Sequence, residues 1–194
     1  MTHLATTRRF ALAAWLAFAV PLAAAQRPDT ATLLAAQADA MKALAMIDGI
    51  WRGTATATQP DGSQLVFTQT ERMGSFLGGT IKVIEGRGYA AGQVRFNALG
   101  IVSYDVAKKA YTIHSHAQGL VGDFAFEPTT DGYRWQIPLG PAASMRYVAV
   151  VKDGELFEVG DRLAAGREPV RVFQMRLKRV ADTDWPAGNA VLPK

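Results

Sequence analysis

His114 and His116 come closest to metal-ligand spacing in this 194-residue chain. Alternate residues of a strand share a face, so both imidazoles would project together, as zinc ligands do. A third ligand would have to come from a neighbouring strand, where Asp123 and Glu127 are available. The alternative is a solvated pair on an outer face, because the apolar residues of this segment alternate with the histidines. With no fixed third partner, we expect neither a metal nor a resident cofactor.

Glu71 and Glu158 are carboxyl groups that strand alternation can place inside a sheet structure. Glu71 shares the phase of Phe67, and Glu158 lies in a strand-like segment. An inward carboxylate among apolar side chains needs a partner, for which Arg162 or Arg176 is available, and such a pair would hold the polar head of a ligand. The open alternative is that both carboxyls point outward into solvent.

Nucleotide-binding and catalytic motifs are incomplete or missing. Residues 86–91 fit the pattern Gly-x-Gly-x-x-Ala, but strand alternation follows where a pyrophosphate site needs a helix N-terminus. Residues 74–80 have the glycine spacing of a P-loop with Thr80 in place of its lysine. We interpret both glycine clusters as hairpin corners. The chain has no cysteine and no evident acid, base and nucleophile set, so we expect no enzymatic activity.

The first 25 residues have the pattern of a secretory signal peptide. Arg8 and Arg9 precede an apolar run, and small residues end at Ala25. The apolar run before Pro21 is shorter than the roughly 20 residues of a bilayer-spanning helix. We therefore predict export, to the periplasm if the source is bacterial, with no stable membrane insertion after cleavage.

Charge argues against a nucleic-acid partner. Removing residues 1–25 takes away two of the 21 basic residues and none of the 17 acidic ones, which leaves 19 against 17. The remaining chain has no basic block, so we expect no nucleic-acid binding.

The histidines and carboxyls must be positioned by strands, because one helix precedes a long series of strand-like segments. Asp29 or Thr30 can cap a helix that ends near Gly49. Its apolar stripe is Leu34, Ala38, Met41 and Ala45.

Beyond that helix the hydrophobic period changes to two. About ten short segments follow, separated by turns such as Pro-Asp-Gly and Lys-Asp-Gly. No crossover helix intervenes, so the sheet should be an antiparallel meander whose strands close on themselves. We predict an all-β domain over residues 26–180 and a tail over residues 181–194, which Trp185 holds against the domain.

The start of this sheet resembles the calycin superfamily, which includes lipocalins and fatty-acid-binding proteins. Gly49, Trp51 and Gly53 carry the resemblance at the helix-to-strand junction. The segments 71–86 and 100–115 are similar to a bacterial lipocalin-like family of unknown function. The matching residues are Glu71, Leu77, Gly78, Gly79, Gly100, Tyr104, Asp105, Lys109 and Tyr111. The resemblance covers residues 44–180 and implies an up-and-down calycin-like barrel with Trp51 at its floor, but no activity.

The resemblance also implies that a late-strand arginine covers Trp51, and Arg171, Arg176 and Arg179 are the candidates. Nitrobindin-like barrels of this superfamily bind haem through a histidine near the C-terminal strands. This chain has no histidine after His116, so His114 or His116 would have to replace it.

Our leading functional hypothesis is a barrel that binds a small, mainly apolar molecule in its lumen. The predicted lining residues are Trp51, Phe67, Glu71, Tyr104, Trp135, Tyr147, Phe157 and Phe173. The alternatives are a barrel filled by its own side chains that acts through its surface, and haem or metal binding through the two histidines.

Overall fold

The computed structural model describes residues 29–186. The predicted signal peptide, residues 1–25, lies outside the described residues, as does the end of the predicted tail. The described residues begin with α1 (Thr30–Met41) and a 3₁₀ helix, η1 (Lys42–Ile47), and a second 3₁₀ turn, η2 (Leu77–Gly79), follows the second strand. The strands are β1 (Gly49–Thr58), β2 (Gln64–Phe76), β3 (Ile81–Ala90), β4 (Gln93–Asp105), β5 (Ala110–Ala117), β6 (Leu120–Pro128), β7 (Gly132–Pro138), β8 (Ala143–Lys152), β9 (Glu155–Ala164) and β10 (Val170–Ala181).

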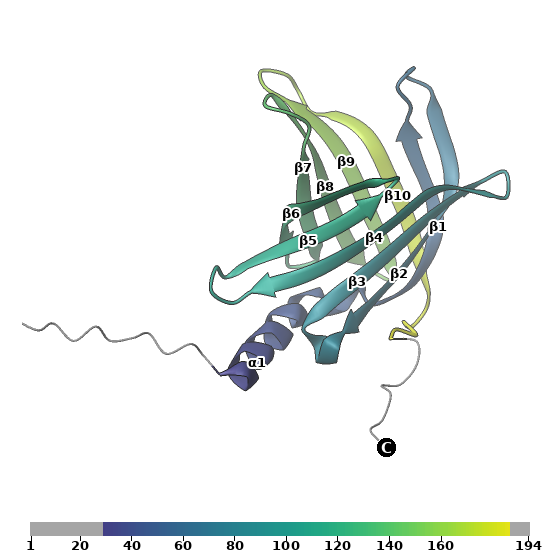
Figure 1. Cartoon of the computed structure of the whole chain (residues 1–194). Coiled ribbons are helices and arrows are strands. Elements are labelled where there is room, and N and C mark those ends of the chain that lie inside the picture. Colours follow the sequence, from purple (N-terminus) through teal and green to yellow (C-terminus); the bar gives the residue numbers. More distant parts are fainter. Residues whose placement is uncertain (1–28, 187–194) are drawn as a thin grey trace, which may run out of the picture.

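These ten strands form one closed antiparallel barrel (Figure 1). Each strand pairs with the next along the chain, and β10 returns to pair with β1. The predicted up-and-down barrel with one N-terminal helix is therefore confirmed. Closure pairs the two outer strands of the sheet with each other, and the free edge that remains lies where β6 and β7 share few residue pairs.

Tight turns connect several of the strands. Both central residues have positive φ at Ala91–Gly92, Gln118–Gly119 and Asp153–Gly154. This conformation matches the right-handed twist of antiparallel strands, and glycine adopts it without steric cost. The short connections explain why neighbours along the chain are also neighbours in the barrel.

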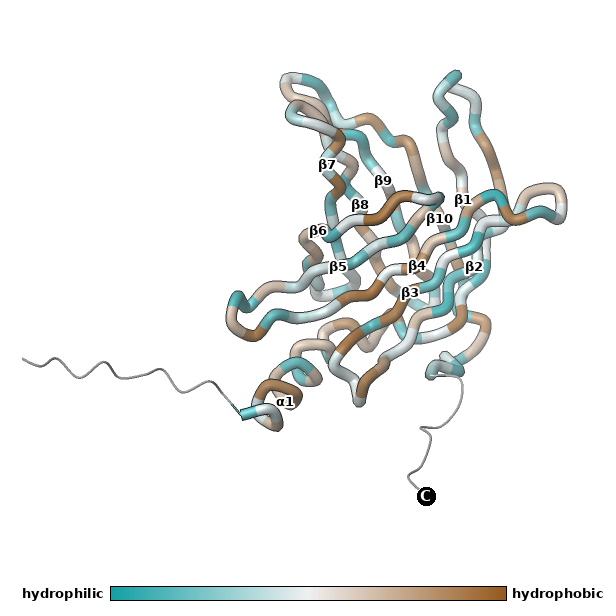
Figure 2. Tube along the Cα trace, in the orientation of Figure 1, coloured by the Kyte–Doolittle hydropathy of each residue, from teal (hydrophilic) through white to brown (hydrophobic). Residues whose placement is uncertain are grey.

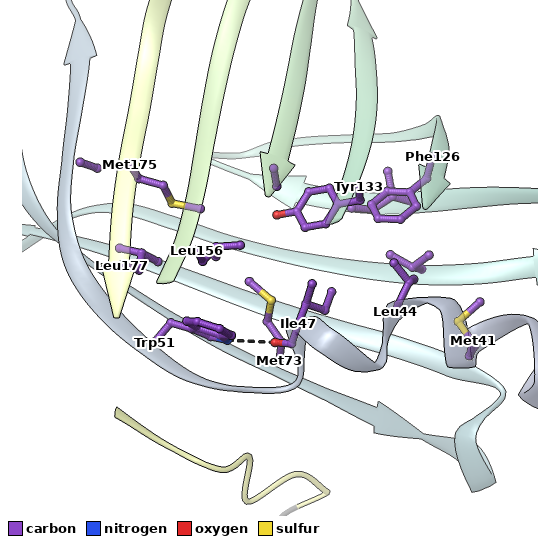
Figure 3. Packing of buried hydrophobic residues seen from close by; sticks show 14 of the residues in the cluster. Met41, Leu44, Ile47, Trp51, Met73, Phe126, Tyr133, Leu156, Met175 and Leu177 are labelled. Atoms are coloured by element: carbon purple, nitrogen blue, oxygen red, sulfur yellow. Dashed lines mark hydrogen bonds between the residues drawn. The ribbon is translucent and has the colours of Figure 1, made fainter. Parts of the chain in front are cut away.

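Hydrophobic and hydrophilic residues alternate along the strands (Figure 2), which gives the barrel a hydrophobic core on its inner face and a wet exterior. Trp51 lies at the closed end of that interior and is 1% exposed. Its indole Nε1 donates a hydrogen bond of 2.9 Å to the Ile47 carbonyl oxygen, and Figure 3 shows it beside Met73 and Leu177. The predicted position of Trp51 is thus correct.

Arg179 is the late-strand arginine that approaches this indole. Its Cζ lies 5.9 Å from the centre of the Trp51 ring. The other two candidates are engaged elsewhere, because Arg171 pairs with Asp161, and Arg176 pairs with Glu155 on the outer face. The cation–π contact therefore belongs to Arg179.

The N-terminal helix differs from the predicted single helix. Asp29 caps it as expected, accepting a hydrogen bond from the Thr32 amide at 2.9 Å. The helix then tightens into η1, and the buried residues Met41, at the end of α1, and Leu44 and Ile47, in η1, recur at intervals of three. Side chains three residues apart eclipse in a 3₁₀ helix, so these three share one face.

The predicted stripe along this helix was consequently wrong at both ends, because Leu34 is 48% exposed and Ala45 is exposed as well. None of the helices within residues 29–186 combines the length and apolar character needed to cross a bilayer. At the other end of the described chain, the Trp185 ring packs edge-on against Phe76 at 5.5 Å, as predicted for the tail.

Candidate functional site

Glu71 on β2 and Glu158 on β9 both point into the barrel, and each is only 7% exposed. The sequence left open whether these carboxyls point inward or outward, and the structure places both inside. Neither carboxyl forms an ion pair among residues 29–186. The predicted partners are wrong, because Arg162 is exposed and Arg176 pairs with Glu155 outside the barrel.

Polar and aromatic side chains surround the two carboxyls. Gln69 Nε2 donates to Glu71 Oε1 at 2.6 Å. The Tyr133 hydroxyl donates to Glu158 Oε2 at 3.3 Å, and Trp135 Nε1 donates to Glu158 Oε1 at 3.5 Å. We call the following six residues the interior cluster: Gln69, Glu71, Tyr133, Trp135, Tyr147 and Glu158.

Burial dominates the electrostatics of this cluster. It raises the pKa of Glu71 to about 8; the Gln69 hydrogen bond opposes the shift, and the charges of Glu158 and Glu85 add to it. Burial also raises the pKa of Glu158 to about 7, against the hydrogen bonds from Trp135 and Tyr133.

The two tyrosines respond in the same direction. Burial, followed by the Glu158 and Glu71 charges, raises the pKa of Tyr133 well above its ordinary value. Burial and the Glu158 charge raise the pKa of Tyr147 to about 12. Both phenols therefore stay neutral at physiological pH, and the Tyr133 hydroxyl donates its hydrogen bond to Glu158.

The buried cation of the barrel is already engaged. Lys82 on β3 is almost completely buried, and its ammonium pairs with Asp48 and bonds Ser75 Oγ at 2.8 Å. Lys82 therefore does not neutralise Glu71 or Glu158.

The side-chain oxygen of Gln69, Oε1, is also buried, and it has no hydrogen-bond partner.

A row of five aromatic side chains runs from β5 to β10 and shares Trp135 and Tyr147 with the interior cluster. Tyr111, Phe126, Trp135 and Tyr147 are successive cross-strand partners on β5 to β8. The Trp135 and Tyr147 rings stack at 4.7 Å, and Phe173 meets Tyr147 edge-on at 6.1 Å. We call these five residues the aromatic row.

Glycine lets the last two members of this row meet. Gly160 on β9 lies between Tyr147 and Phe173 in the sheet register. A Cβ at this position would lie 2.9 Å from Tyr147 Cε1 and 3.0 Å from Phe173 Cβ. A larger residue at Gly160 would therefore push the two rings apart.

Gly86 and Gly88 serve the site in a similar way. The predicted hairpin corner here is wrong, because both residues lie within β3 and are buried. A Cβ at Gly86 would lie 2.7 Å from Glu71 Oε1, and one at Gly88 would lie 2.7 Å from the Phe67 ring. These glycines leave room for the inward side chains of β2. The second predicted corner is correct, since Gly78 and Gly79 form η2.

A pocket of about 780 Å³ opens in the wall where β6 meets β7. These two strands are joined through only three residue pairs, Phe126 with Trp135 to Pro128 with Tyr133. The pocket is lined by Tyr111, Phe126 and Trp135 from the aromatic row, together with Glu127, Arg134 and Arg146. Arg134 pairs with Glu127 at 2.6 Å, and Arg146 lies 3.5 Å from Asp161. Trp135 belongs to both the pocket and the interior cluster.

The three remaining predicted lining residues lie in different places. Phe67 faces inward and is buried. The Tyr104 and Tyr111 ring centres lie 4.8 Å apart, and Gln37 Nε2 of α1 donates a hydrogen bond to the Tyr104 carbonyl oxygen. Phe157 lies on the outer face under Arg176. Its placement in the lining was therefore wrong, because alternation with the inward Glu158 turns it outward.

The two histidines lie outside the interior cluster. They project from one face of β5, with ring centres 4.8 Å apart, and His114 Nδ1 lies 2.7 Å from Asp123 Oδ1. The other suggested third ligand, Glu127, pairs with Arg134. Within residues 29–186, no group of three or more His, Cys, Asp or Glu side chains is arranged to hold a metal ion.

Gln69 and Tyr133 are site residues that sequence reasoning missed. Gln69 precedes Glu71 by two residues and Tyr133 precedes Trp135 by two, so each shares a face with a predicted site residue. The two-residue period of a β-strand was therefore the signal in the sequence that could have identified Gln69 and Tyr133. The hydrogen bond between Tyr133 and Glu158 joins non-neighbouring strands, and no local pattern indicates it.

Taken with this geometry, the closed ten-strand barrel is consistent with a calycin-like fold. Among solved structures, Rv2717c from M. tuberculosis is similar, with a TM-score of 0.52 and 14% sequence identity over 72% of this chain and 96% of that chain. At this identity the likeness shows the fold alone. No protein-family model matches the chain, and no curated protein matches it.

Proposed function

We propose that this protein is an exported, lipocalin-like barrel of the calycin superfamily that binds a small, mainly apolar molecule. The supporting observation is the aromatic row beside a pocket of about 780 Å³, a volume within the range of small-molecule sites. Trp135 links the pocket to the buried carboxyls, so a molecule seated against its ring has polar groups within reach.

A neutral aromatic probe tests the proposal. 2-(1-Naphthyl)ethanol should bind the purified domain, as measured by isothermal titration calorimetry. Trp135→Ala should weaken binding about tenfold or more, because it removes the ring shared by the pocket and the interior cluster. Trp185→Ala is the matched control, since Trp185 packs outside the barrel against Phe76, and it should leave the affinity unchanged.

Two results together would contradict the proposal. One is the absence of heat with the naphthyl probe. The other is the absence of any small molecule when the protein, exposed to a lipid extract and repurified, is examined by mass spectrometry. Equal affinity of wild type and Trp135→Ala would place the probe away from the pocket between β6 and β7.

A further inference from the structure

The interior cluster contains more hydrogen-bond acceptors than donors. Glu71 and Glu158 present four carboxyl oxygens, and Gln69 adds an amide oxygen. The donors that reach them are Gln69 Nε2, the Tyr133 hydroxyl and Trp135 Nε1. Two of these three bonds, at 3.3 and 3.5 Å, are longer than a typical protein hydrogen bond. The cluster can therefore accept further donors.

Gln69 provides independent evidence that the interior cluster lacks a hydrogen-bonding partner. Its side chain is 1% exposed, its Nε2 bonds Glu71, and its Oε1 has no partner. Rotating the amide by half a turn would exchange the two ends and leave the nitrogen unpaired instead. An unsatisfied buried amide lowers stability in either orientation, and a ligand group at this position would satisfy it.

Charge narrows the kind of ligand. Two acids that face each other's charge destabilise the barrel unless a cation or a proton neutralises them. Lys82 is committed to Asp48, and neither glutamate forms an ion pair within the described part of the chain. The stacked Trp135 and Tyr147 rings add faces that attract cations.

We propose that the interior cluster binds the ammonium head of an organic amine, with Glu71 and Glu158 as counter-ions and Gln69 Oε1 as an additional acceptor. The aromatic row and the pocket between β6 and β7 take the apolar body of the amine. This inference rests on the proposed small-molecule binding and specifies the chemical class of the ligand.

Three probes with the same ring system and different heads test the inference by calorimetry at pH 8. They are 2-(1-naphthyl)ethylamine, 2-(1-naphthyl)ethanol and 1-naphthaleneacetate. The amine should bind about tenfold or more tightly than the alcohol, because charge-assisted hydrogen bonds are stronger than neutral ones. The carboxylate should bind most weakly, since the two glutamates repel it.

A double variant and its control show where the preference for the amine over the alcohol arises. Glu71→Gln combined with Glu158→Gln removes both acids while keeping their shape, so the amine should lose its advantage over the alcohol. Glu155→Gln is the matched control, because Glu155 lies on the same strand as Glu158 but pairs with Arg176 outside the barrel. This control should keep the wild-type preference.

The outcomes separate this inference from the proposed function. Equal binding of amine and alcohol, tighter binding of the carboxylate, or an unchanged preference in the double variant would each overturn the amine assignment while leaving small-molecule binding intact. Failure of all three probes would overturn the amine assignment, and together with the absence of any molecule captured from the lipid extract it would contradict small-molecule binding itself.

Discussion

Burial of Glu71 and Glu158 makes the stability of the ligand-free barrel depend on pH. Their folded-state pKa values, about 8 and about 7, lie above the ordinary value of 4.5. Between these limits the folded protein holds protons that the unfolded chain has released, so stability falls as pH rises. The free energy of unfolding should therefore be higher at pH 5 than at pH 8, by several kcal/mol, as measured by urea denaturation.

Substitutions identify the groups responsible for the pH dependence of the free energy of unfolding. The charged groups that act on Glu71 are Glu158 and Glu85, and the nearest titratable neighbour of Glu158 is the neutral Tyr133. Glu71→Gln with Glu158→Gln should flatten the stability profile between pH 5 and 8, whereas the outer-face control Glu155→Gln should not. A wild-type protein that gains stability over this interval would contradict the assignment.

The sequence contained part of this residue-scale information. Glu71 shares its strand phase with Phe67, which allowed an inward carboxyl but did not exclude an outward one, because the buried face of the strand was not known. The arginine partners could not be predicted, because pairing depends on which face each residue of β9 and β10 occupies. Phe157 shows the same difficulty: its size suggested a lining residue, but the adjacent inward Glu158 requires it to point outward.

At the scale of single strands, Gly86 on β3 should be needed for the position of Glu71 on β2. The two residues are cross-strand partners, and a Cβ at Gly86 would lie 2.7 Å from Glu71 Oε1. Gly86→Ala should therefore destabilise the barrel by about 1–3 kcal/mol through overpacking, as measured by urea denaturation.

The same substitution in a Glu71→Ala background provides the control. Removing the carboxylate opens the space that the new methyl group needs, so the cost of Gly86→Ala should fall well below its cost in the wild type. Equal costs in the two backgrounds would show that Gly86 is required for another reason.

Element boundaries were predicted better than element interiors. The Asp-Gly turns indicated where strands end, and β8 and β9 are indeed joined at Asp153 and Gly154. Gly86 and Gly88 were mistaken for a corner because glycine at a turn and glycine beneath a large side chain look identical in one sequence. The change from α1 to η1 was missed since apolar residues at intervals of three also fit an α-helix.

At the scale of the whole molecule, closure of the barrel brings the site together. The order β2, β1, β10, β9 places Glu71 and Glu158 on strands separated by two others, one near each end of the chain. Alternation, short turns and the absence of crossovers were enough to predict a closed meander. They did not predict which side chains meet across the interior, because that depends on how the registers of all the strands add up around the barrel.

The most direct test of a ligand site inside this barrel is a crystal structure of the protein with 2-(1-naphthyl)ethylamine. We predict the ammonium nitrogen within hydrogen-bonding distance of Glu71 and Glu158, and the naphthyl ring against Trp135. An amine bound only on the outer surface, with the two carboxyls unchanged, would contradict the account.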